Sequence, residues 1–340
     1  MYRKNMNKFI GALLVLLSLL TGCRDIETTT EIYPDGSCKH NVVVQGDSSD
    51  ISRSTFPIPT DTSWTITQYD SGEFTYIAEK TFKKVADWDK EMNYCRDKSR
   101  EMTIIPELKK KFRWFYTIYQ YRETWKAVNK LYNVPITDFL SPDEIKLLAS
   151  QDDSSAQAKA VDEKIENWEK RNIFIGFYKE LINAAAELND STLSEDVIEA
   201  RKEQLYKLFT EEISDDFEYK KDFLTKLAAL LRTNAVKRLE NDLVYFLARQ
   251  KARMESLTEI SLTEFENHVI MPGLILDTNA KTVEGREAAW DIKPKQFMFT
   301  DFTMTVESRL VNIWAVVITL VLFLIAVLIL LLPLILRKNK

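Results

Sequence analysis

Two long apolar runs stand at the ends of this chain, and the residues between them alternate between polar and apolar positions. The second run, residues 313–336, holds 24 residues without a charge, and Thr319 is its polar position. At a rise of ~1.5 Å per residue it reaches about 36 Å, which is enough to cross a bilayer. We therefore expect a transmembrane helix over residues 311–336, followed by a cytoplasmic tail over residues 337–340.

The first apolar run belongs to an export signal. Residues 1–8 are basic, residues 9–20 are mainly apolar, and Leu20-Thr21-Gly22-Cys23 follows. This order resembles the lipobox of bacterial lipoproteins, in which the cysteine becomes the first residue after cleavage and carries acyl chains. We expect a signal peptide over residues 1–22 and an acyl anchor, such as palmitate, on Cys23. A plain secretory signal that is cut near Gly22 is the alternative.

Charged and aromatic residues at the edges of the C-terminal run predict its orientation. Trp314 lies at one edge, where an indole favours the membrane interface, and three basic residues follow the other edge: Arg337, Lys338 and Lys340. The positive-inside rule places this basic end in the cytoplasm. We therefore expect a plasma-membrane protein with its ectodomain outside the cytoplasm; the outer membrane or the cell surface is the alternative.

Between the two runs, the pattern predicts an α+β ectodomain. Strands are indicated around a Pro34-Asp35-Gly36-Ser37 turn, over residues 73–83 and 111–122, and again after residue 257. From Ser141 to about Met254 the apolar spacing is helical, and Ser141 and Glu144 form a capping box. We expect one antiparallel sheet, built from residues 23–140 and 257–310, with a helical insertion over residues 141–256.

The charge distribution argues against nucleic acid as a partner. The net charge is −5, and the first 22 and last 30 residues each carry three basic residues and no acid, which leaves −11 for the middle of the chain. An acidic middle repels phosphate backbones. The expected contacts are membrane lipid, through the acyl anchor and the helix, and an envelope protein.

Candidate catalytic chemistry is sparse. The two histidines, His40 and His268, do not fit a metal-binding spacing, and no phosphate loop or nucleophile motif occurs, so we expect neither a metal nor a cofactor. We expect a non-catalytic binding or scaffold module. An envelope hydrolase that uses paired carboxylates and an accessory subunit of a membrane complex are the alternatives.

Cys38 and Cys95 are the cysteines that remain after lipidation, and they form a candidate disulfide pair. An oxidising compartment permits such a bond. A bridge that closes this loop contributes ~4 kcal/mol in the loop-entropy model. Two separate buried thiols are the alternative.

The closing segment resembles LppM-type bacterial lipoproteins. The residues that carry the resemblance are Met271-Pro272-Gly273, Asp277-Thr278-Asn279, Trp290 and Glu307-Ser308-Arg309, together with the lipobox and the Asp35-Gly36 turn. It covers about residues 23–125 and 257–336 and leaves out the helical block. The resemblance implies a compact α+β domain between a processed N-terminus and a C-terminal membrane helix, with an envelope role and contact with lipid or glycolipid.

Overall fold

The computed structural model of the protein describes residues 24–48, 55–70, 74–94, 102–131, 133–149, 156–214 and 216–338. The signal peptide and Cys23 lie outside these residues. The chain forms two compact units: residues 1–126, 263–292 and 301–340 make the first, and residues 127–262 and 293–300 make the second. The α+β class is confirmed. The predicted insertion, residues 141–256, falls within the second unit, and its boundaries stay a prediction.

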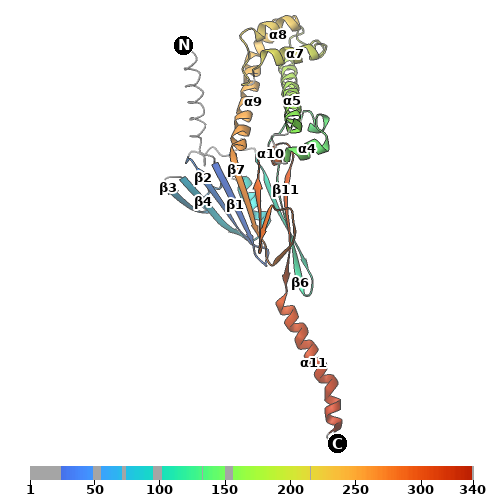
Figure 1. Ribbon diagram of the computed structural model, residues 1–340. Coiled ribbons are helices and arrows are strands. Elements are labelled where there is room, and N and C mark those ends of the chain that lie inside the picture. The colour runs from blue at the N-terminus through green and yellow to red at the C-terminus, as the bar shows by residue number, and fades with distance from the viewer. Residues whose placement is uncertain are drawn as a thin grey trace. The chain divides into compact units, whose positions relative to one another are not determined.

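The first unit contains a seven-stranded sheet, here called sheet A (Figure 1). Its strand order is β3-β4-β2-β1-β7-β10-β9. The pairs are antiparallel except for β1 and β7, which are parallel. The strands are β1 (Arg24–Ile32), β2 (Cys38–Gly46), β3 (Thr65–Asp70), β4 (Phe74–Phe82), β7 (Thr263–Ile270), β9 (Thr282–Glu284) and β10 (Glu287–Ile292).

A second sheet, here called sheet B, has the order β5-β6-β11-β8 and is antiparallel throughout. The unit therefore has two sheets where the sequence predicted one. Its strands are β5 (Ile104–Phe112), β6 (Tyr116–Trp125), β8 (Leu274–Thr278) and β11 (Phe302–Val311). The described part of the unit also contains the helices α3 (Val85–Tyr94) and α11 (Ile313–Lys338), which follows β11.

Two predicted strands differ from the structure. Residues 111–122 were expected to form one strand, but β5 ends at Phe112 and the chain turns back before β6. The turn, Arg113 to Phe115, lacks glycine, proline and asparagine, so the sequence carries no signal for it. After residue 257, where the pattern indicated strands, the chain also forms the short helix α10 (Lys295–Met298) before β11.

A buried polar network joins the two sheets. Glu123 of β6 is almost fully buried, and its carboxylate accepts hydrogen bonds from the Tyr121 hydroxyl (2.6 Å), Trp125 Nε1 (2.6 Å) and Asn267 Nδ2 on β7 (3.2 Å). Thr28 of β1 in turn donates to Asn267 Oδ1 at 2.7 Å. Burial raises the pKa of Glu123, whereas the three donors act to lower it. Since each buried polar group needs its partner, the network fixes the register of one sheet against the other.

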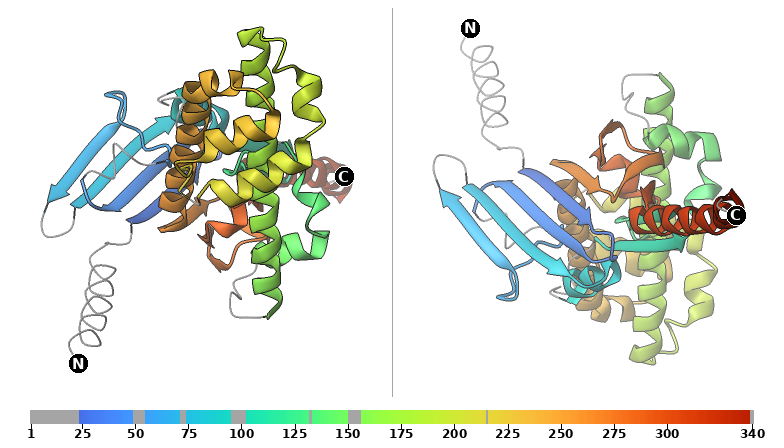
Figure 2. Two further views of the ribbon diagram at one scale, coloured as in Figure 1. Left: turned by 90° about the horizontal axis from the view of Figure 1, so that it is seen from above. Right: turned by 90° about the horizontal axis from the view of Figure 1, so that it is seen from below.

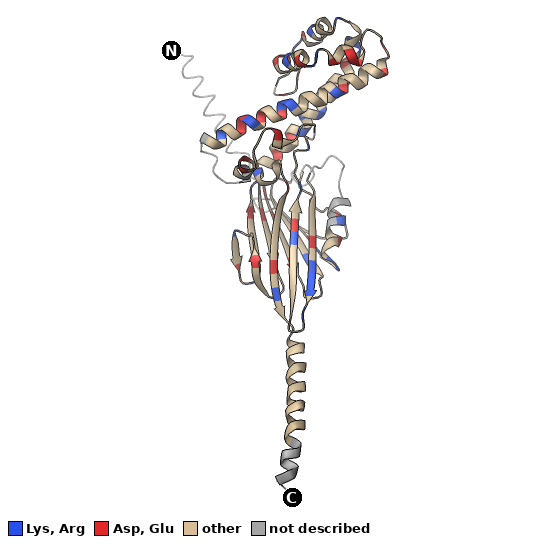
Figure 3. Ribbon diagram, turned by 90° about the vertical axis from the view of Figure 1, so that its right-hand side faces the viewer, with Lys and Arg blue, Asp and Glu red and all other residues tan. Residues whose placement is uncertain are grey.

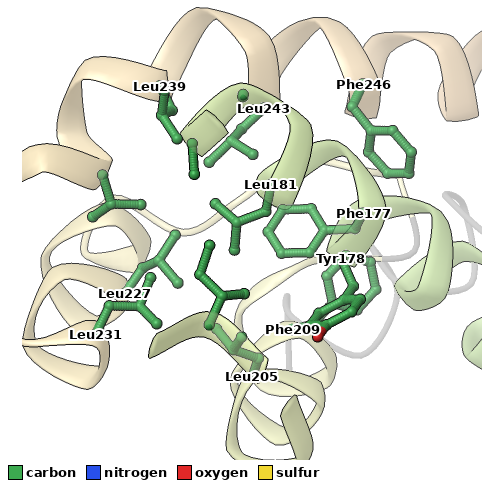
Figure 4. Close-up of a cluster of buried hydrophobic side chains, with 14 of the residues drawn as sticks. Phe177, Tyr178, Leu181, Leu205, Phe209, Leu227, Leu231, Leu239, Leu243 and Phe246 are labelled. Atoms are coloured by element: carbon green, nitrogen blue, oxygen red, sulfur yellow. The ribbon is translucent and has the colours of Figure 1, made fainter. Parts of the chain in front are cut away.

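The second unit is helical and has its own apolar core (Figure 4). Phe177 and Leu181 of the long helix α5 lie among leucines and aromatic rings from the shorter helices. The elements are α4 (Pro142–Ala149), α5 (Ala156–Leu188), α6 (Glu195–Glu199), α7 (Lys202–Glu212), α8 (Phe223–Leu231) and α9 (Glu240–Ser261), with 3₁₀ turns η1 (Ile136–Asp138) and η2 (Ala235–Leu239). The expected capping box at Ser141 and Glu144 is present.

His40 is a buried core residue. Its ring stacks on Trp88 with centroids 4.3 Å apart, and Nδ1 lies 2.9 Å from Thr30 Oγ1. Burial lowers the pKa of His40 to about 3, so the ring is neutral in the folded protein at neutral pH. The unfolded ring has a pKa near 6.5. Between pH ~6.5 and ~3, therefore, the imidazole of the unfolded chain is protonated while that of the folded protein stays neutral, and this difference favours unfolding.

We predict that acidification destabilises the protein through His40. From pH 7 to pH 5 this residue should lower the free energy of unfolding by about 2 kcal/mol, to be measured by urea unfolding followed by tryptophan fluorescence. His40→Phe preserves a ring against Trp88 and should remove this part of the pH dependence. An unchanged slope in the variant would contradict the assignment. Partial burial acts to lower the pKa of His268, but the nearby Glu287 and Glu27 raise it overall, so its contribution to the pH dependence of stability has the opposite sign. This contribution is the same in the wild type and in the variant, and it therefore cancels when their two slopes are compared.

Candidate functional site

Helix α11 has the length and composition of a membrane span. Residues Ile313–Leu331 have a mean hydropathy of 3.3, and only 6% of this segment is buried. Nineteen residues extend ~28 Å, close to the thickness of the hydrocarbon core. Between Ile313 and Leu331 its side chains are exposed around the helix, unlike the single buried stripe of a helix that packs on a protein core. In Figure 3 the part of the helix that is drawn in colour carries neither Lys or Arg nor Asp or Glu.

Asn312 attaches α11 to the tip between β5 and β6, without a flexible linker. Its Nδ2 donates to the carbonyl oxygens of Arg113 (2.8 Å) and Trp114 (3.2 Å), and its Oδ1 accepts from Thr117 Oγ1 (3.0 Å). Its backbone N–H donates to the Phe115 carbonyl, while its own carbonyl accepts from the first turn of α11. Asn312 is 8% exposed, so these bonds are largely shielded from water. The start of α11 is therefore fixed to sheet B by hydrogen bonds.

Aromatic side chains surround the start of α11. Trp314 stacks on Phe112 with centroids 6.3 Å apart and meets Trp114 edge-on at 5.5 Å. Trp114 Nε1 donates to Thr319 Oγ1 at 2.9 Å, so the one polar side chain of the apolar run has a partner. Indole rings favour the membrane–water interface. Trp314, which was predicted to lie at the edge of the span, thus contacts two further aromatic residues, Phe112 and Trp114. Both of them were expected to lie inside a strand over residues 111–122.

The turn between β1 and β2 lies at the same end of the first unit. The Pro34 carbonyl accepts from Lys110 Nζ (2.7 Å) and from the Tyr119 hydroxyl (2.8 Å). The Lys110 ammonium also lies over the Tyr119 ring, 5.4 Å from its centroid. A cavity of about 620 Å³ opens here, beside the first turn of α11; it is lined by Pro34, Lys110, Phe112, Thr117, Tyr119, Leu310, Val311, Asn312, Ile313 and Trp314. We call this region, from the tip of β5 and β6 to the start of α11, the junction.

A second concave region lies on the exposed face of sheet B. Asp277 of β8 and Glu307 of β11 are direct cross-strand neighbours, and Glu307 accepts a hydrogen bond from Gln120 on β6 at 2.6 Å. Together with Glu107 and Arg122 they line a cavity of about 280 Å³. The structure thus brings three carboxylates to one cavity, an arrangement that the sequence did not reveal because the three residues come from distant segments.

Only some of the residues that the sequence analysis singled out as site residues fall within the part of the chain that the structure describes. Cys23, Cys95 and Lys340 lie outside the described residues, and Arg337 and Lys338 form the end of α11. Cys38 is fully buried and has no disulfide partner among the described residues; burial, with a smaller effect of Asp87, raises the pKa of its thiol to about 12. Lipidation of Cys23, pairing of Cys38 with Cys95 and the topology of the basic tail stay predictions.

Comparisons with known proteins give one distant match. No family model matches the chain, and no curated protein matches it. Among solved structures, the NMR structure of the folded domain of Mycobacterium tuberculosis LppM is similar over 85% of this chain and 91% of that domain, with 10% sequence identity and a TM-score of 0.30.

Proposed function

We propose that the protein is a membrane-anchored envelope lipoprotein whose ectodomain acts as a non-catalytic binding or scaffold module. The observation that carries this proposal is the junction, where an exposed apolar helix begins directly on a folded sheet. A helix with 6% of its span buried has no protein core to cover it, so lipid is its natural surrounding. The bonds of Asn312 couple the orientation of the helix to that of sheet B.

The proposed location is the plasma membrane, with the ectodomain outside the cytoplasm. The export signal delivers the residues after Cys23 across this membrane, and α11 stops there with Arg337 and Lys338 on the cytoplasmic side. Membrane lipid is the proposed partner of both anchors. The ligand of the ectodomain is proposed to be an envelope protein or a lipid; the cavity at the junction lies beside the start of the proposed span.

The two proposed anchors can be tested separately by labelling four forms of the protein with palmitate and separating membrane from soluble fractions. Cys23→Ser should lose labelled palmitate but stay in the membrane fraction through α11. A chain that ends at Asn312 should keep the label and stay in the membrane through its acyl chains. The doubly changed chain should become soluble, while the wild type should be labelled and membrane-bound. Membrane retention of the doubly changed chain, or protease access to Lys340 from outside the cell, would contradict the proposal.

A hydrolase with paired carboxylates is the second candidate. Three carboxylates at the cavity on sheet B, those of Glu107, Asp277 and Glu307, favour it. Glycosidases place two such groups about 5–10 Å apart around the scissile bond. This candidate requires that the purified chain cleave an envelope polysaccharide and that Asp277→Asn and Glu307→Gln each abolish the cleavage. Equal turnover by wild type and both variants would exclude these residues as its catalytic pair.

A further inference from the structure

Among the described residues, the outer edge of β3 differs from the other sheet edges in lacking the lysines, proline, bulge or very short length that hinder pairing. The two sheets have four edge strands: β3 and β9 in sheet A, and β5 and β8 in sheet B. An edge strand presents unpaired N–H and C=O groups, and proteins protect it with lysine, proline, bulges or short length. An edge strand of this molecule that carries none of these features can therefore pair with a strand of another chain.

Three of the edges carry such protection. β5 contains Pro106 and three consecutive lysines, Lys109 to Lys111. β8 has five residues, and its pairing with β11 shifts register between Glu307 and Ser308. β9 has only three residues. Each of these features hinders the addition of a further strand.

β3 has six residues, Thr65–Asp70, with neither a lysine nor a proline. It pairs with β4 in an uninterrupted register, and within the described part of the chain no strand pairs with its other side (Figures 1 and 2). Ile66 is 36% exposed and Tyr69 is 54% exposed. In a chain in which 29% of the residues are charged, this edge has a single charge, on Asp70.

The edge is also held in place, which reduces the cost of ordering it on binding. Trp64, directly before β3, is 4% exposed and packs edge-on against Phe82, with centroids 5.5 Å apart. Lys80 Nζ of β4 donates to Ser63 Oγ at 2.8 Å. A preformed edge loses little conformational entropy when it gains a partner.

We propose that β3 is a docking edge for an extended segment of another envelope protein, which adds to sheet A as an eighth strand. Main-chain hydrogen bonds supply the affinity in this mode of recognition, and alternate side chains supply the selectivity. This inference deepens the proposed binding function by naming its surface and its class of partner.

The chemistry of β3 specifies the segment. Ile66 lies opposite the buried Ala78, on the core side of the sheet, whereas Tyr69 lies opposite Thr75 on the other side. Both faces thus offer apolar or hydroxyl contacts, which suit an uncharged segment of β-branched residues. Acids stand at the two ends of the edge, Asp61 just before it and Asp70 at its end, so basic residues at the ends of the segment complement them.

A second copy of this chain is a poorer occupant than a foreign segment. Two β3 strands would meet along only ~20 Å. That contact falls far below the ~800 Å² per partner of a stable dimer interface. Two copies would also bring Asp61 and Asp70 of each chain against those of the other. A single extended segment avoids the like charges and requires only transient affinity.

The test uses the full chain in lipid nanodiscs and a synthetic peptide, Lys-Thr-Val-Thr-Val-Thr-Lys. Amide hydrogen exchange is measured residue by residue along β3. Since β4 already protects every second amide of β3, an added strand should slow exchange at the remaining alternate amides, by about tenfold near saturation. Protection at consecutive amides, or none at all, would overturn the proposal.

Three controls sharpen this test. A peptide with proline at its centre should give no protection, because it lacks one N–H and disfavours the ladder. Thr67→Lys places a charge in the middle of the edge and should weaken binding about tenfold, whereas Val283→Lys, on the opposite edge strand β9, should leave binding unchanged. Thermal unfolding of both variants reports whether each folds. Equal weakening by both substitutions would overturn the assignment to β3.

Photocrosslinking identifies the occupant in cells. A benzophenone side chain at position 69 should crosslink to one extended segment of another protein, and Thr67→Lys should abolish the product. A product that joins two copies of this chain would overturn the proposed occupant. Neither measurement depends on palmitate labelling or on the topology of α11, so failure of this inference is distinguishable from failure of the proposed anchoring.

Discussion

Replacing Gly273 with alanine is expected to lower the free energy of unfolding by about 3 kcal/mol or more. Gly273 has a φ of +86°, in the left-handed region that side chains other than glycine rarely adopt. A Cβ at this position would lie 2.3 Å from the Arg309 carbonyl oxygen and 2.8 Å from the Leu310 Cα, both of them backbone atoms of β11. Because backbone in a paired strand yields little, β8 has to move away from β11. Urea unfolding followed by tryptophan fluorescence measures the loss.

Gly285→Ala is the matched control for this substitution. Gly285 also has a positive φ, +62°, but a Cβ at this position would have no neighbour within 4 Å. The conformational penalty should then appear alone, at about 1 kcal/mol. If the two variants lose equal stability, close approach of β8 to β11 does not explain the glycine at position 273.

Replacing Asn312 with alanine is expected to loosen the junction and to cost about 3 kcal/mol, since each buried group left without its partner costs about 1 kcal/mol. The change removes the donors to the carbonyls of Arg113 and Trp114, in bonds that are part-buried, and the acceptor of the Thr117 hydroxyl, in a bond that is buried. Hydrogen exchange at the Asn312 amide, which donates to Phe115, should speed up in the full chain in nanodiscs.

Ile313→Ala provides the comparison for the junction. Ile313 is the neighbouring residue, but it is 72% exposed and should not change exchange at position 312. Faster exchange in both variants would indicate general fraying of α11, whereas no change in Asn312→Ala would show that the helix does not depend on this side chain.

The parts of the fold that local patterns specify were predictable. The hairpin around Pro34 and Gly36 formed as expected, with Gly36 at a φ of +98°. The C-terminal apolar run forms the helix that was expected. In each case the decisive signal lies within a few consecutive residues, so tertiary context was not needed.

The division into two sheets was not predictable, because it depends on long-range pairing. The β1 strand pairs with β7 across the whole helical segment, and β6 pairs with β11 across nearly two hundred residues. Alternation along a strand reports which face is buried but not which strand lies beside it. The tip between β5 and β6 was missed for a different reason: its residues are ones that also favour strands, so the pattern continued through the turn.

The candidate site was predicted only in part. Trp314 and the apolar helix follow from composition and position along the chain. The roles of Asn312 and Trp114 emerge only when β6 and β11 pair, since their partners lie far away in sequence. The carboxylates of Asp277 and Glu307 meet for the same reason.

Under the proposed topology, the direction of β1 limits how the first unit can lie against a bilayer. The turn that follows β1 touches Lys110 and Tyr119 at the junction, so Arg24, at the other end of the strand, is about 26 Å away from it. Cys23 is covalently bonded to Arg24, the first residue of β1. An acylated Cys23 would therefore have no linker between its acyl chains and sheet A. If these acyl chains and α11 enter the same leaflet, the strands of sheet A must lie roughly parallel to the membrane surface, along the headgroups, and not perpendicular to it.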